Sequence, residues 1–153
     1  MNSYEYLIDE CYKQGVKVIE KKFKSKAKGL WKNNKIGISN DISTNTEKLC
    51  VLAEEYAHYL TSSGNILDLS DISNLKQENE ARSYAYEKLC SIPKIVHAIR
   101  NGANNKYEIA EYLNVTDNFL ADAIKHHKCK HGLFYKHEDI LISFEPTFMI
   151  CEA

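Results

Sequence analysis

Apolar residues recur at helical spacing along most of the chain. Near the N-terminus Tyr4, Leu7, Ile8 and Cys11 fall on one helical face, and Gly15 is suited to end that helix. Further along, caps and breakers help to mark the boundaries of each periodic segment. The pattern predicts helices over residues 4–14, 44–61, 75–90, 93–100, 107–113 and 117–131.

Short apolar runs near both ends of the chain have the character of strands. Residues 29–31 and 35–39 flank Asn33-Asn34, a dipeptide that tolerates positive φ and so predicts a hairpin. The other predicted strands are 16–19, 133–136 and 140–144. With helices between these strands, the sequence predicts one α+β domain over residues 1–153. Its parts would be an N-terminal half (about 1–92), a helical part (93–131) and closing strands (132–153).

Composition places the chain among ordinary globular proteins. It has 153 residues, of which 44% are hydrophobic and 27% charged, and a formal net charge of −1. This balance gives no general attraction to nucleic acid or to anionic membranes. The charge is uneven, however, because the segment 17–35 is rich in Lys and the segment 47–71 is acidic. The acidic segment suits a cation-binding region.

Targeting signals and cysteine usage indicate the compartment. The N-terminus has no apolar signal core, and no apolar run is long enough to span a bilayer. The five Cys are scattered and form no Cys-x-x-Cys pair, which is typical of reduced thiols. We therefore expect a cytoplasmic protein that does not associate with membranes.

The predicted helix 44–61 carries the segment Glu54-Glu55-Tyr-Ala-His58. It differs at one position from His-Glu-x-x-His, in which two His on one helical face hold a metal beside a Glu base. Residues four apart share a helical face, so Glu54 and His58 point in the same direction. Glu55 keeps the spacing of the base, and Glu54 stands where the first His is expected.

A second segment, Glu78-Asn-Glu80-Ala81-Arg-Ser-Tyr-Ala85, follows on the next predicted helix. Together with Leu-Ala-Glu-Glu before His58, the exit after Thr61 and the closing Phe144-Glu-Pro, it resembles the ImmA/IrrE family of metallo-endopeptidases. The similarity is greatest to short members from prophages and other mobile elements of Gram-positive bacteria. It extends over nearly the whole chain, but its specific part is residues 49–89.

The resemblance implies a fold, a site and a substrate. The fold would be zincin-like, with a small sheet, a mostly helical core and a C-terminal helical pair. Glu55 would be the general base, and the metal ligands would be His58, Glu80 and Glu54, with Asp68 as a further candidate near the ion. The cofactor would be a divalent metal, zinc in the family, with manganese as the alternative because carboxylates favour harder ions. The substrate would be a partner protein, a helix-turn-helix repressor of the mobile element.

Other interpretations stay open at this stage. A chain with an impaired site would act as a repressor-binding module, with Glu54 solvated and His58 merely hydrogen-bonded to Glu80. Residues 107–131 have the spacing of a DNA-binding helix-turn-helix, although Asp117 and Asp122 at the start of its second helix would repel phosphates. His127 and His131, four residues apart, are more typical of a basic helix end than of a second metal site.

Overall fold

The computed structural model describes residues 1–61, 72–144 and 149–152. These residues form two compact units, Met1–Ala85 and Tyr86–Ala153, each described below by itself. Helix α3 begins in the first unit and ends in the second. The single domain expected from the sequence stays a prediction.

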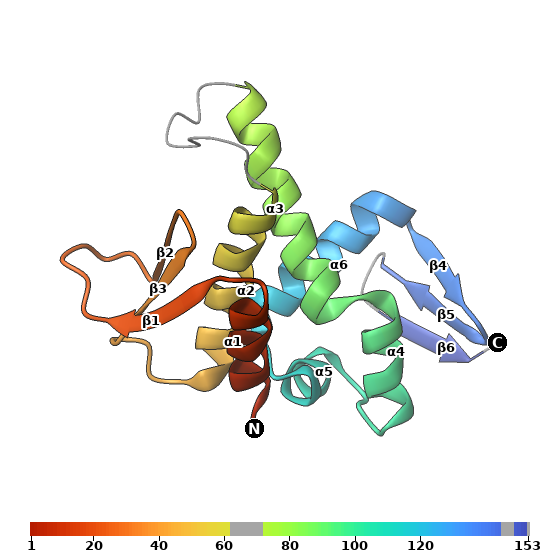
Figure 1. Cartoon of the computed structure of the whole chain (residues 1–153). Coiled ribbons are helices and arrows are strands. Elements are labelled where there is room, and N and C mark those ends of the chain that lie inside the picture. The colour runs from red at the N-terminus through yellow and green to blue at the C-terminus, as the bar shows by residue number, and fades with distance from the viewer. Residues whose placement is uncertain (62–71, 145–148, 153) are drawn as a thin grey trace. The chain divides into compact units, whose positions relative to one another are not determined.

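The first unit combines helices with a small mixed sheet (Figure 1). Strand β3 is central: it pairs parallel with β1 and antiparallel with β2, so that β1 and β2 are the edge strands of the described sheet. The elements are α1 (Ser3–Lys13), β1 (Lys17–Lys21), β2 (Gly29–Lys32), β3 (Lys35–Ser39), α2 (Asn45–Thr61) and the first part of α3 (Ile72–Cys90).

The hairpin predicted at Asn33-Asn34 is confirmed. Lys32 pairs with Lys35 across a two-residue turn, and Asn33 adopts a positive φ of 54°. The Trp31 indole N–H donates to the carbonyl oxygen of Asn33 over 2.8 Å. Asn accepts the left-handed conformation that a tight turn needs, so the sequence signal had a direct physical cause.

Helix starts are fixed by short polar side chains. Asn2 and Glu5 form a reciprocal capping box at the start of α1. At the start of α2, Thr44 accepts from the Glu47 backbone N–H over 3.2 Å, and the Glu47 carboxylate pairs with Lys28. Both helices begin close to the predicted residues.

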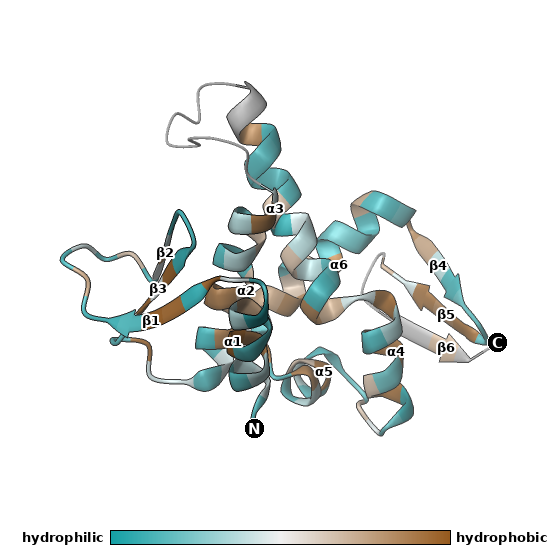
Figure 2. Cartoon of the chain, viewed as in Figure 1, coloured by the Kyte–Doolittle hydropathy of each residue, from teal (hydrophilic) through white to brown (hydrophobic). Residues whose placement is uncertain are grey.

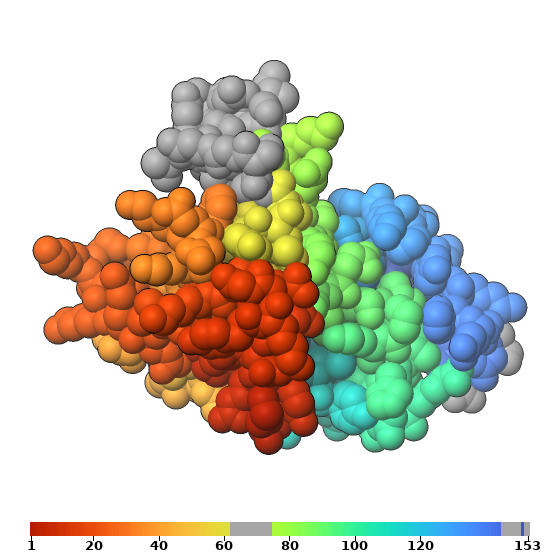
Figure 3. Space-filling view, in the orientation of Figure 1, coloured from red at the N-terminus to blue at the C-terminus, as the bar shows by residue number. Residues whose placement is uncertain are grey.

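Helix α2 is the centre of packing in the first unit. It contacts α1, β2 and β3, and in the space-filling view the atoms of α1 (red) lie next to those at the end of α2 (yellow) (Figure 3). Colouring by hydropathy shows apolar residues along α2 and the strands (Figure 2). The buried apolar residues of α2 are Leu49, Cys50, Leu52, Ala53, Tyr56 and Ala57. Their burial holds the polar residues between them in fixed positions.

The second unit combines three further helices with an antiparallel sheet of order β4-β5-β6. Its elements after α3 are α4 (Ile92–Arg100), α5 (Lys106–Leu113), α6 (Asp117–His131), β4 (Phe134–His137), β5 (Ile140–Ser143) and β6 (Met149–Glu152). The sequence predicted the helices and the first two strands. Strand β6 was not predicted from the sequence.

Side-chain caps set the boundaries of these helices. Ser91, Asn105 and Thr116 each accept a backbone N–H at the N-terminus of α4, α5 and α6. Asn114 ends α5 in the left-handed conformation, with φ at 59°. The predicted α+β class is therefore confirmed. None of the helices in the described ranges has both the length and the apolar character that crossing a membrane requires.

Candidate functional site

Helix α2 presents the three residues of the motif beside its buried stripe. Glu54, Glu55 and His58 are all partly buried. Glu55 and His58, three residues apart, lie on neighbouring positions of the helix surface. The packing of α2 against the sheet therefore keeps two carboxylates and an imidazole together at the border of the core.

The imidazole of His58 faces a carboxylate from the next helix. Its Nε2 atom lies 3.5 Å from Oε2 of Glu78, and the two side chains are only 14% and 18% exposed. Among the described residues, His58 Nδ1 is buried and has no hydrogen-bond partner. Burial, opposed by Glu78 and assisted by Arg82, lowers the pKa of His58. A neutral imidazole with an uncommitted nitrogen is what a metal ligand offers.

The carboxylate opposite His58 belongs to Glu78, whereas the sequence assigned this place to Glu80. Glu80 is exposed. Residues two apart on a helix are rotated by about 200°, so Glu78 and Glu80 point away from one another. Glu78 is also held by Arg82, whose Nε lies 3.3 Å from Oε1. The structure favours Glu78 over Glu80, and the ligand assignment itself stays a prediction.

Glu55 has the electrostatic character of a general base. Burial, reinforced by the nearby carboxylates of Glu54 and Glu78, raises the pKa of Glu55 to about 7. A carboxyl group with such a pKa takes up and releases a proton near neutral pH, which suits acid–base catalysis. The prediction that Glu55 is the base is therefore compatible with its surroundings.

The site residues fit a divalent cation in their chemistry. The carboxylates of Glu54 and Glu78 both lie close enough to Glu55 to interact with it electrostatically. Arg82 forms an ion pair with Glu78. Oxygen and imidazole donors suit zinc and manganese. The predicted ligands do not form a tight triad, however. Across the described ranges, ligand atoms of three such side chains lie within 4.8 Å of one another only at Glu87, His126 and His127, in the second unit.

One residue of the site was missed from the sequence. Gly29, the first residue of β2, approaches α2 so closely that a Cβ there would lie 2.6 Å from Val51 Cγ1 and 2.9 Å from Glu55 Cγ. Only glycine allows the edge strand to run against the base at this distance. A glycine inside a predicted strand often marks such a close approach, so the signal was present.

Some predicted site residues lie outside the described part of the chain, whereas the predicted helix pair of residues 107–131 is present. Asp68, Glu145 and Pro146 lie outside the described residues. The helix pair α5 and α6 is present, with Asp117 and Asp122 exposed at the start of α6. Exposed acids where base-reading residues would lie disfavour DNA binding.

Comparison with known proteins agrees with the geometry. A peptidase family model described as the IrrE N-terminal-like domain matches residues 11–125. The match includes all of α2, α4 and α5 and the Glu54–His58 motif. No curated protein and no solved structure matches the chain. Because the family model matches well over half of the sequence, the chain belongs to the ImmA/IrrE family of metallopeptidases.

Proposed function

We propose that this protein is a metal-dependent endopeptidase that cleaves a partner protein. The observation that carries the proposal is the partly buried Glu55 carboxyl group, with a pKa raised to about 7, beside the His58–Glu78 pair. Membership of a metallopeptidase family supports the same reaction class. The remaining steps follow from the chemistry of these side chains.

The metal ligands we propose are His58, Glu78 and Glu54, with Glu78 in place of the Glu80 expected from the sequence. Zinc is the proposed cofactor, and manganese is the alternative because two of the three ligands are carboxylates. These residues would hold a divalent ion, which would supply Lewis acidity toward the peptide carbonyl. Glu54 adds negative charge where the family motif has a neutral His, so the Lewis acidity of the ion is reduced.

Glu55 moves the proton in this proposal. Its carboxylate accepts a proton from the attacking water and passes it to the departing amine. A cation beside Glu55 would offset the repulsion from Glu54 and Glu78 and lower its pKa. Glu55 would then be ionised at neutral pH, the state that a base requires.

An extended peptide is the substrate form that fits the sheet. Strand β2 lies at the edge of the sheet that the described residues form, and its Gly29 lies directly against Glu55. An extended segment that adds to such an edge is held by backbone hydrogen bonds. A scissile bond near Gly29 would then lie close to the base. We propose a helix-turn-helix repressor of a mobile element or prophage as the partner.

Glu54 supports a second candidate function. If the carboxylate at the first His position weakens the site enough, the protein would bind the repressor without cleaving it. Both functions use the same surface but differ in their dependence on Glu55.

Co-expression with the proposed helix-turn-helix repressor separates the two functions. We expect wild type to cleave the repressor and Glu55→Gln to leave it intact while still binding it. Glu80→Gln, an exposed substitution on the same helix as Glu78, is the matched control and should cleave normally. Equal survival of the repressor with wild type and Glu55→Gln, with binding retained, would establish the binding module instead.

A further inference from the structure

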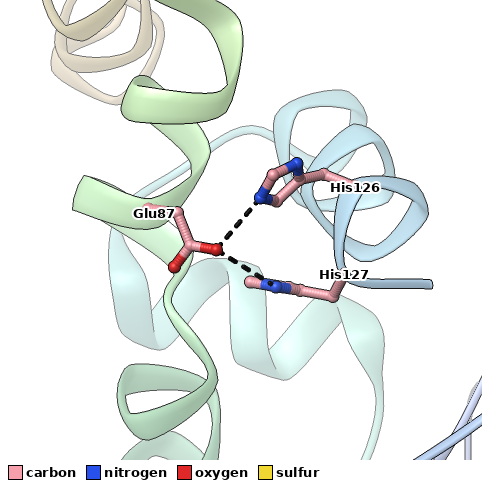
Figure 4. Close-up of side chains that lie close together, drawn as sticks. All are labelled: Glu87, His126 and His127. Carbon is pink, nitrogen blue, oxygen red and sulfur yellow. Dashed lines mark hydrogen bonds and ion pairs between the residues drawn. The ribbon is translucent and has the colours of Figure 1, made fainter. Parts of the chain in front are cut away.

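A second cluster of metal-ligating side chains lies within the second unit, outside the site described above. The last turn of α3 contributes Glu87, and α6 contributes His126 and His127 (Figure 4). Glu87 Oε1 lies 3.0 Å from His126 Nε2 and 3.7 Å from His127 Nδ1. Ligand atoms from all three side chains lie within 4.8 Å of one another.

The tautomer of His127 follows from its other contact. His127 Nε2 lies 2.7 Å from the backbone carbonyl oxygen of Cys90. A carbonyl oxygen only accepts, so Nε2 carries the hydrogen and donates. In a neutral ring Nδ1 then presents a lone pair. This lone pair faces the carboxylate of Glu87, which is also an acceptor.

Two acceptors that face one another are stabilised by a proton or a cation between them, and here the His127 side of the contact is buried while the Glu87 side chain is 38% exposed. His127 is fully buried, and its Nδ1 has no hydrogen-bond partner among the described residues. A second proton on the ring would satisfy the contact, but burial lowers the pKa of His127 and opposes the charged form. A metal ion satisfies both lone pairs and leaves the ring neutral.

We propose that Glu87, His126 and His127 form a second binding site for a divalent transition metal of the zinc type. Ligands at about 2.1 Å from a tetrahedral zinc lie about 3.4 Å apart, and the two distances to Glu87 Oε1, 3.0 and 3.7 Å, bracket this value. Two imidazoles and one carboxylate are a donor set that zinc accepts. His126 would bind through Nε2, with its hydrogen on Nδ1.

The charge around the cluster is compatible with this ion. Lys130 Nζ lies 3.4 Å from Glu87 Oε1, but its side chain is 56% exposed and is free to turn toward solvent when a cation binds. The bound metal would link the last turn of α3 to α6 within the second unit. The family match ends at residue 125, so both histidines lie beyond the part of the chain that the family model describes.

Binding of Co²⁺ to the His58→Gln protein tests the proposal without interference from the peptidase site. Four-coordinate Co²⁺ absorbs visible light strongly, so the titration reports both stoichiometry and geometry. We expect one equivalent to bind, with this absorption. Adding Glu87→Gln or His126→Gln should weaken binding by about 100-fold, the upper range for changes around a metal. Both residues are partly exposed, and circular dichroism checks that each variant is folded.

His131→Gln in the same background is the matched control. His131 lies four residues after His127 and packs against Tyr135, with ring centroids 4.0 Å apart and the rings tilted by 42°. Its substitution should not alter Co²⁺ binding. Folded His58→Gln protein that binds no Co²⁺, or that binds it equally well with Glu87→Gln and His126→Gln, would overturn the proposal. Loss of binding with His131→Gln alone would also overturn it, in favour of a His127–His131 pair.

Discussion

His58 on α2 and Glu78 on α3 face one another, with Nε2 and Oε2 3.5 Å apart. The two residues are separated by a segment that includes the end of α2 and the start of α3, so neither helix alone forms the site. The pair lies beside Glu55, whose pKa is raised by burial and by the carboxylates of Glu54 and Glu78. This relationship is the basis of the predictions below.

Glu78→Gln should weaken zinc binding at the first site far more than Glu80→Gln. Loss of a residue that only orients a metal ligand weakens metal binding by up to about 100-fold. Loss of the ligand Glu78 itself should weaken zinc binding by about 100-fold or more. Glu80 is exposed, so its substitution should change the affinity by less than about twofold. Chelator competition on the His126→Gln background measures both. A larger loss of zinc affinity with Glu80→Gln would show that Glu80, the residue indicated by the sequence, is the ligand.

Glu54→His should strengthen zinc binding and increase peptidase activity. The substitution restores His-Glu-x-x-His and removes one negative charge from the surroundings of Glu55. We expect a gain in zinc affinity of about tenfold, comparable with other changes around a metal ligand. The preference for manganese over zinc should decrease at the same time. Unchanged affinity for both metals would show that residue 54 is not a ligand.

Glu55→Gln should stabilise the metal-free protein at alkaline pH. In the folded state the pKa of Glu55 is about 7, compared with an ordinary value of 4.5. The folded protein therefore retains a proton that the unfolded chain releases, and the free energy of unfolding falls as the pH rises from about 4.5 to 7. Above pH 8 the charged group costs about 1–3 kcal/mol.

Urea unfolding of wild type and Glu55→Gln at several pH values measures this difference. The variant should be more stable at pH 8, and the gap should close toward pH 4.5. A gap that is constant with pH would mean that Glu55 does not titrate in this range. Adding zinc should reduce the gap at pH 8, because a nearby cation stabilises the Glu55 carboxylate.

Gly29→Ala should impair both stability and activity. The new Cβ would lie 2.6 Å from Val51 Cγ1 and 2.9 Å from Glu55 Cγ, so β2 or α2 has to shift. Overpacking of this kind costs about 1–3 kcal/mol, and the shift would displace the base.

Gly37→Ala is the matched control in the same sheet. Its Cβ would meet the ring of Phe23 at 3.2 Å, a contact that a small side-chain movement relieves. Thermal unfolding and cleavage of the repressor are measured for both variants. Equal effects of the two substitutions would argue against a specific role of the contact between Gly29 and Glu55.

Much of the fold follows from local signals in the sequence. The Asn33-Asn34 turn and the short polar side chains before the helices act on backbone groups within a few residues. The hairpin and the helix starts can therefore be predicted from the local sequence. Strand β6 was not predicted, because no local turn signal like Asn33-Asn34 marks its pairing with β5.

The site was harder to predict from the sequence than the fold, because it depends on contacts between helices. The motif identifies Glu55 and His58, but the choice between Glu78 and Glu80 depends on how α3 is rotated about its axis, which the Glu-Ala pattern does not define. The cluster of Glu87, His126 and His127 joins residues about forty positions apart. Only the fold brings these residues together.

The most direct test of the account is cleavage of the purified repressor by metal-free protein after addition of zinc or manganese. Mass spectrometry of the repressor identifies the cut bond. We expect products with metal-loaded wild type, none with metal-free wild type, and none with metal-loaded Glu55→Gln. Cleavage that persists without metal, or that is equal for wild type and Glu55→Gln, would contradict it.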